Sequence, residues 1–217
     1  MTGEEALALF RAQVGKPIWK ILEDSGTTLT LSPRNIRNKG LGGLLLEAII
    51  GKAHDSHQRP DLDDGTEVKK ASIERQVRVP FGVKETVQVT MINRKIALPK
   101  EFSESHLYSK TRKILMVPTL YAGKGKQSEE ILLPPRLWIP SDSFNTRMNS
   151  DYTEVLDTIA DPKKGFDALT GSMGQVVEPR TKGSKSSSSR AFYFKTSAVK
   201  EILGESYFKD LVHLEGL

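Results

Sequence analysis

The sequence has no cysteine, and it lacks the segments that would place a protein in or across a membrane. Without thiols, neither a disulfide scaffold nor a thiolate metal site can form. No apolar run approaches the roughly 20 residues that a membrane-spanning helix needs. The N-terminus, Met-Thr-Gly-Glu-Glu, is acidic and leads directly into an amphipathic pattern, unlike a signal peptide. These absences predict an intracellular, cytoplasmic protein with no membrane partner.

Two common kinds of functional site are also missing. The glycines at positions 40, 42 and 43 are not followed by Gly-Lys-Ser/Thr, so they do not form a phosphate-binding loop of the P-loop type. The histidines do not have the spacing of metal ligands, and we expect them to be structural or to lie at the surface. They are His54, His57, His106 and His213.

The composition is that of an ordinary globular protein with a basic surplus. The chain has 217 residues, of which 37% are hydrophobic and 27% charged. This length fits one domain, or two small lobes that share a core. The net charge of +5 matters where the lysines and arginines cluster, because positive patches bind the phosphates of nucleic acids. For any single patch, a surplus that only improves solubility is the alternative.

The segment 60–69 carries the most distinctive chemistry. Asp61 precedes an Asp-Asp-Gly turn, and Glu67 and Lys69 lie two residues apart in a segment that reads as a strand. Alternate residues of a strand share a face, so Glu67 and Lys69 point the same way while Val68 turns toward the core. If the turn returns Asp61 to the strand, two carboxylates and an ammonium group converge. Such a group suits Mg²⁺-assisted hydrolysis of a phosphodiester bond.

The same segment has a plainer interpretation. Asp-Asp-Gly is a common turn, and Glu-x-Lys on a strand is often only a solvated charged face. Short motifs of this kind arise frequently by chance, so the remainder of the chain has to decide.

Hydrophobic periodicity predicts a sheet with helices at both ends of the chain. A Thr-Gly-Glu-Glu capping box starts an N-terminal helix, and an apolar helix over 41–50 contains Glu47, a carboxylate that is costly there unless it is paired. The alternation of residues predicts an antiparallel or mixed sheet. The expected strands cover 67–69, 85–92, 114–118, 131–139, 176–178 and 191–195, and further helices cover 149–161 and 196–203.

Two basic segments are candidates for contact with nucleic acid. Residues 105–113 are basic and partly aromatic, and they precede an apolar strand. Residues 179–190 join two strands and combine four basic residues, at positions 180, 182, 185 and 190, with a serine run. This loop is either a disordered hairpin tip or a DNA-contacting loop that orders on binding.

Together these segments resemble the MutH family of DNA endonucleases. That family includes the mismatch-repair nicking enzyme and the type II restriction enzymes that cut GATC, all built on the PD-(D/E)XK nuclease core. The resemblance runs nearly end to end, over separated blocks in the same order. The blocks are Lys39-Gly40 with Leu45-Leu46-Glu47, Pro60-Asp61 with Glu67-Val68-Lys69, Ser105-His106 with Lys110 before 114–118, the segment 177–182, and Arg190-Ala191-Phe192-Tyr193.

The resemblance implies an α/β fold with a central mixed sheet flanked by helices and two lobes around a DNA cleft. The catalytic lobe would cover roughly 1–100 and the DNA-recognition lobe roughly 101–217. It also implies roles for individual residues. Asp61, Glu67 and the Val68 carbonyl would bind Mg²⁺, and Glu47 would complete the acidic cluster. Lys69 would activate or orient the water, and Lys39 and Lys110 would hold the scissile phosphate. Arg180 and Tyr193 would face the DNA bases, with Lys182 near them.

The resemblance leaves several alternatives open. The spacing from Asp61 to Glu67 is shorter than the family pattern, so Asp63 or Asp64 could be the ligand instead. The segment between Arg180 and Tyr193 is also shorter than in the repair enzyme. The expected activity is sequence-specific cleavage of double-stranded DNA at GATC-like sites, by a restriction enzyme or by a repair nickase with a MutL-like partner. The enzyme would act as a monomer or a DNA-induced dimer. The alternative outside enzymology is a non-catalytic DNA-binding or allosteric domain on the same fold.

Overall fold

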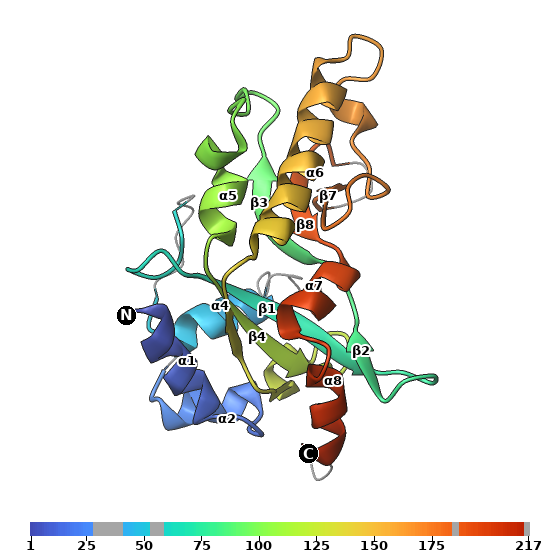
Figure 1. Cartoon of the computed structure of the whole chain (residues 1–217). Coiled ribbons are helices and arrows are strands. Elements are labelled where there is room, and N and C mark those ends of the chain that lie inside the picture. Colours follow the sequence, from blue (N-terminus) through green and yellow to red (C-terminus); the bar gives the residue numbers. More distant parts are fainter. Residues whose placement is uncertain (28–40, 53–58, 184–186, 215–217) are drawn as a thin grey trace.

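The structure is a computed structural model that describes residues 1–27, 41–52, 59–183 and 187–214, and it contains two β-sheets surrounded by helices (Figure 1). The helices are α1 (Gly3–Arg11), α2 (Ile18–Asp24), α4 (Leu41–Ile49), α5 (His106–Thr111), α6 (Asp142–Ala160), α7 (Thr196–Leu203) and α8 (Tyr207–Asp210). The strands are β1 (Glu67–Arg75), β2 (Phe81–Val83), β3 (Val87–Ile92), β4 (Ile114–Leu120), β5 (Ile131–Leu132), β6 (Arg136–Trp138), β7 (Val177–Thr181) and β8 (Arg190–Phe194).

The first sheet has the order β2-β1-β4-β5, and β6 also pairs with β4. Strands β1 and β4 are parallel, with Glu67 opposite Ile114. Strand β2 is antiparallel to β1 and joins it only from Ile73 onward. The start of β1 therefore has β4 on one side only among the described strands.

The second sheet is antiparallel and has the order β3-β8-β7. Its register places Gln88 of β3 opposite Tyr193 of β8, and Tyr193 opposite Glu178 of β7. These three side chains thus lie in one row across the sheet, since opposite residues of paired strands share a face. An irregularity in the ladder follows Gln88.

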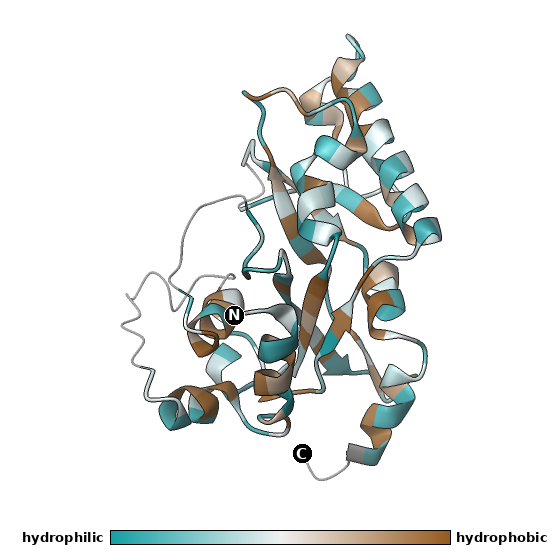
Figure 2. Ribbon diagram, turned by 60° about the vertical axis from the view of Figure 1, so that its left-hand side comes forward, coloured by the Kyte–Doolittle hydropathy of each residue, from teal (hydrophilic) through white to brown (hydrophobic). Residues whose placement is uncertain are grey.

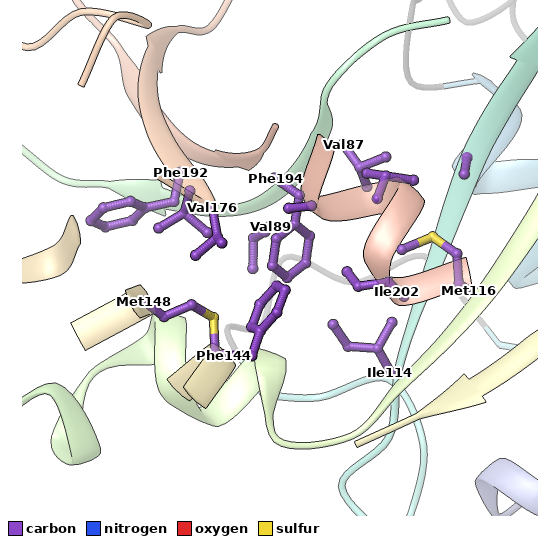
Figure 3. Packing of buried hydrophobic residues seen from close by; sticks show 14 of the residues in the cluster. Val87, Val89, Ile114, Met116, Phe144, Met148, Val176, Phe192, Phe194 and Ile202 are labelled. Atoms are coloured by element: carbon purple, nitrogen blue, oxygen red, sulfur yellow. The ribbon is translucent and has the colours of Figure 1, made fainter. Parts of the chain in front are cut away.

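The first sheet separates two hydrophobic cores. Alternate residues of β4 divide between them: Ile114 and Met116 belong to one core, and Leu115 and Val117 to the other. The first core joins this sheet to the second sheet and to α6 and α7, as Figure 3 shows for Ile114, Met116, Phe194 and their neighbours. The second core lies under α1, α2 and α4. In Figure 2 the central strands are largely hydrophobic, while the outer helices alternate between hydrophilic and hydrophobic residues.

The predicted mixed sheet flanked by helices is confirmed, with differences in detail. The expected strand over 131–139 is divided into β5 and β6, because Pro134 and Pro135 between them have no N–H to donate to a ladder. The expected helix over 149–161 begins earlier, at Asp142, where the Ser141 hydroxyl accepts a hydrogen bond from the Phe144 N–H.

The two sheets do not divide at residue 100, the expected boundary between the lobes. Strand β3 precedes that residue but belongs to the second sheet, whereas β4, β5 and β6 follow it and belong to the first sheet. Because one core also spans both sheets, the lobes are not separate hydrophobic units. Within the described ranges, no helix is long and apolar enough to cross a membrane.

Candidate active site

The turn before β1 returns Asp61 to the strand. The Leu62 N–H donates to the Thr66 carbonyl over 2.9 Å, and Gly65 takes a φ of 79° that favours glycine. The Asp61 Oδ2 then accepts a hydrogen bond from the Val68 N–H at 2.9 Å, and Oδ1 accepts one from the Lys52 ammonium at 2.5 Å. The predicted return of this carboxylate to the strand is therefore observed.

Glu67 and Lys69 share one face of β1, as the alternation predicts, and Val68 packs in the core on the other face. The Glu67 carboxylate is almost fully buried, and two ammonium groups compensate its charge. Lys69 Nζ lies 2.5 Å from Oε1, and Lys110 Nζ donates to Oε1 and Oε2 over 2.9 and 3.1 Å. The predicted contact of Lys110 with the scissile phosphate stays a prediction, since in this structure Lys110 binds Glu67.

Lys69 connects the two carboxylates electrostatically. Burial raises the pKa of Asp61, but the hydrogen bond from Lys52, the charge of Lys69 and the bond from the Val68 N–H outweigh burial, so the pKa lies below its ordinary value. Asp61 is thus held as a carboxylate. Lys69 acts on Asp61 by its charge and on Glu67 by direct contact.

The Val68 carbonyl lies on the same edge of β1 as Asp61. The N–H and C=O of one strand residue point to the same edge, and those of the next residue point to the other. Because the Glu67 N–H donates to Lys113 O beside β4, the backbone groups of Val68 face the opposite edge, where Asp61 accepts its N–H. The edge therefore presents a carboxylate and a carbonyl oxygen.

The structure favours Asp61 over its two neighbours as a member of the site. Asp63 contacts the N-terminal amine and is largely exposed. Asp64 accepts hydrogen bonds from the Lys113 ammonium at 2.7 Å and from the Gly3 N–H at 3.1 Å. Asp63 and Asp64 thus bind groups other than those that bind the Asp61 and Glu67 carboxylates.

The available donors suit a hard divalent cation. Mg²⁺ is usually bound by one or two carboxylates together with water and substrate phosphate oxygens, and Asp61, Glu67 and the Val68 carbonyl supply oxygen ligands of this kind. Glu47 is half-buried on α4, which packs against β1. Among the described residues, no three His, Cys, Asp or Glu side chains form a group that could hold a metal ion, so Glu47 does not complete an acidic cluster here. Its catalytic role stays a prediction.

The predicted DNA-contacting residues lie on the second sheet. Arg180 is on β7 and half-exposed, and Tyr193 lies on β8 in the row described above. Lys182 follows β7, where burial and the charge of Lys69 lower its pKa. The hairpin formed by β7 and β8 therefore comes near the first sheet at Lys69. Lys39 lies outside the described residues.

Two contacts of the site were not predicted from the sequence. Lys52 binds Asp61, and Glu178 contacts Arg180. The sequence alone does not predict the contact of Lys52 with Asp61. The two residues are nine positions apart, which is not the spacing of neighbours within one helix or strand. Glu178 lies two residues before Arg180 on a strand, so the alternation of the strand could have predicted that the two side chains share a face.

The chain is similar to DNA mismatch repair proteins named MutH. Residues 50–151, which include Asp61, β1 and Lys110, match the family model described as "DNA mismatch repair enzyme MutH". The chain is 28% identical to the DNA mismatch repair protein MutH of Histophilus somni (strain 2336) over 159 residues, which cover 73% of this chain and 68% of the relative. It is 23% identical to the protein of that name from Vibrio cholerae serotype O1 (strain M66-2) over 222 positions, covering 95% and 97%.

Proposed function

The chain belongs to the MutH family of DNA endonucleases, and we propose that it is a Mg²⁺-dependent enzyme that hydrolyses phosphodiester bonds at GATC-like sites in double-stranded DNA. One observation carries the proposal: Asp61, Glu67 and Lys69 meet at the start of β1. Two carboxylates beside a lysine ammonium suit metal-assisted attack on a phosphate.

Each group at the centre has a defined task. Mg²⁺ held by Asp61, Glu67 and the Val68 carbonyl would polarise a phosphoryl oxygen and lower the pKa of a bound water. Lys69 offers its ammonium beside Glu67, where it offsets the negative charge that develops on the phosphate and orients the water. Lys110 holds the Glu67 carboxylate in place through its two hydrogen bonds. The water oxygen bonds to phosphorus in line as the bond to the 3′-oxygen breaks, which leaves a 3′-hydroxyl and a 5′-phosphate.

The proposal leaves two kinds of endonuclease. The relatives named above are mismatch-repair proteins, which supports a nickase that works with a MutL-like partner. The short segment between Arg180 and Tyr193 supports a recognition loop of a different kind, as in a restriction enzyme. Nicked plasmid indicates the first enzyme, and linear plasmid the second. A monomer suffices for a nick, while a DNA-induced dimer suits a double-strand cut.

A non-catalytic DNA-binding module is the competing function, and a plasmid assay decides between the two. Wild type, Lys69→Ala and the control Lys126→Ala, whose lysine is exposed, are incubated with methylated and unmethylated plasmid in Mg²⁺ or EDTA. We expect cleavage by the wild type and the control in Mg²⁺ only, with a rate at least about 100-fold lower for Lys69→Ala. If none of the proteins cuts but all bind DNA with a steep salt dependence, the module is correct. Mapping the ends identifies the site.

A further inference from the structure

The outward face of the second sheet holds Arg180 in a fixed position. It lies on the same face as the row formed by Gln88, Tyr193 and Glu178, because Glu178 and Arg180 are two residues apart on β7. Arg180 NH1 donates to the Thr86 hydroxyl at 3.0 Å and lies 3.4 Å from Glu178 Oε1. The guanidinium thus contacts both outer strands of the sheet. It pairs with Glu178 on β7 and donates a hydrogen bond to Thr86, just before β3.

The loop that contains Gly171 passes close to the side chain of Arg180. A Cβ atom on Gly171 would lie 3.2 Å from Arg180 Nε and 3.5 Å from its Cγ, so the backbone of the loop passes close to the side chain. Glycine at this position leaves room for the side chain. The side chain therefore lies between the loop and the sheet, which restricts its rotamers.

Glu178 is unusual for a carboxylate on a sheet that faces solvent. Its side chain is 8% exposed, whereas that of Arg180 is 49% exposed. Burial raises the pKa of Glu178, although the charges of Arg180 and Lys195 act to lower it. Lys195 Nζ is 3.9 Å away, at the distant limit of an ion pair. A buried carboxylate whose ion pairs are this long costs stability, which favours a functional reason for its presence.

We propose that Glu178 is a positioning residue for base recognition: its buried carboxylate, with the Thr86 hydroxyl, holds Arg180 ready to bind a guanine in the major groove. This inference rests on the proposed function. Arginine has five N–H donors, and two contacts on NH1 leave the remaining donors for guanine O6 and N7. Holding the side chain before binding lowers the conformational entropy lost on binding. Glu178 itself is too buried to reach a base.

Equilibrium binding tests this role separately from cleavage. Fluorescence anisotropy in EDTA measures the affinities of wild type, Glu178→Ala, Arg180→Ala and the double variant for a 20-bp duplex with GATC and for the same duplex with the four bases scrambled. We expect Glu178→Ala to bind the GATC duplex about 10-fold more weakly, because an arginine that is not held in advance loses more conformational entropy on binding. Affinity for the scrambled duplex stays unchanged. The double variant resembles Arg180→Ala, since Glu178 acts through Arg180.

A conservative variant separates positioning from folding. Glu178→Gln keeps an oxygen that accepts from Arg180, so we expect it to recover most of the preference for GATC. If Glu178→Ala does not fold, Glu178→Met, which fills the buried site but has no oxygen to accept from Arg180, serves as the test protein and should lose the same preference. Replacing the guanine by 7-deazaguanine removes N7, and we expect this change to weaken the wild type but not Glu178→Ala. The inference is wrong if Glu178→Ala prefers GATC as strongly as the wild type, or if the two single losses add. If the wild type cuts at GATC but the Glu178 variants do not behave as expected, the proposed function stands and the role of Glu178 is wrong. If the wild type neither cuts nor prefers GATC, the proposed function and the role of Glu178 are both wrong.

Discussion

At the scale of single residues, the carboxylates of the candidate active site already have cationic partners. Asp61 binds Lys52, and Glu67 binds Lys69 and Lys110. A divalent cation that binds here must compete with these ammonium groups, because both draw on the same carboxylate oxygens. We therefore expect these lysines to lower the affinity of the site for a divalent cation.

Replacing Lys52 by methionine should strengthen metal binding. Methionine keeps most of the apolar stem but removes the ammonium 2.5 Å from Asp61 Oδ1, so this oxygen becomes available to a cation. We expect isothermal titration calorimetry to show Mn²⁺ binding several-fold tighter than in the wild type. Lys113→Met, which removes the partner of Asp64, is the matched control and should bind Mn²⁺ as the wild type does. Unchanged or weaker binding by Lys52→Met would contradict competition at Asp61.

Asp64 should make folding stability depend on pH. Burial raises the pKa of Asp64, but hydrogen bonds from Lys113, Gly3 and Thr66 outweigh burial and hold it well below the ordinary value. A carboxyl group whose pKa is lower in the folded state stabilises the fold at pH values above its unfolded pKa of about 3.9, and this stabilisation is lost as the pH falls through the folded value.

Urea unfolding of Asp64→Asn at two pH values tests this dependence. We expect the variant to lose about 1–2 kcal/mol at pH 7, since charged hydrogen bonds of this kind contribute that much. The difference from the wild type should shrink at pH 3. Asp63→Asn, at a side chain that is 82% exposed, should change little at either pH. A loss that is equal at both pH values would show that ionisation of Asp64 is not the cause.

At the scale of elements, one carboxylate attaches α6 to β7. Asp151 is 3% exposed and accepts hydrogen bonds from the backbone N–H groups of Gln175, Val176 and Val177, at 2.7, 2.8 and 2.8 Å. These bonds fix the start of the strand that carries Glu178 and Arg180. The position of the face that carries Glu178 and Arg180 thus depends on α6, which packs on the opposite face of the sheet.

Replacing Asp151 by leucine should destabilise the protein strongly. Three backbone N–H groups would be left in the interior without an acceptor, and each unsatisfied group costs roughly 1–3 kcal/mol. We expect urea unfolding to show a loss of about 3 kcal/mol or more. Asp157→Leu, on the exposed side of the same helix, should change stability by less than about 0.5 kcal/mol. If both variants were equally stable, the contacts of Asp151 would not support β7.

The sequence predicts local geometry better than contacts between elements. Alternation along β1 was enough to place Glu67 and Lys69 on one face and Val68 in the core, because period-2 geometry is a property of the strand itself. The contact between Lys110 and Glu67 spans 43 residues and depends on how α5 docks, and no local pattern encodes that docking. The division of the segment 131–139 did have a local signal, the Pro-Pro pair.

At the scale of the whole molecule, the first sheet carries the candidate active site at the start of β1 and packs against a hydrophobic core on each face. The core under α1, α2 and α4 fixes one face, and the core shared with the second sheet fixes the other. Lys182 follows β7 and lies near enough to Lys69 that the charge of Lys69, together with burial, lowers the pKa of Lys182. Two ammonium groups from different sheets therefore approach each other, and a DNA phosphate between them would relieve their repulsion.

The cleavage rate of Glu67→Gln tests the central claim, that the charged group at the start of β1 is the catalytic centre. Glutamine keeps the shape of Glu67 but not its charge. Single-turnover cleavage of a plasmid containing GATC in Mg²⁺ is compared for wild type, Glu67→Gln and the control Glu23→Gln, whose side chain is exposed on α2. We expect Glu67→Gln to bind the plasmid as the wild type does and to cut it at least about 100-fold more slowly, with Glu23→Gln unchanged. Cleavage by Glu67→Gln at the wild-type rate would contradict the account.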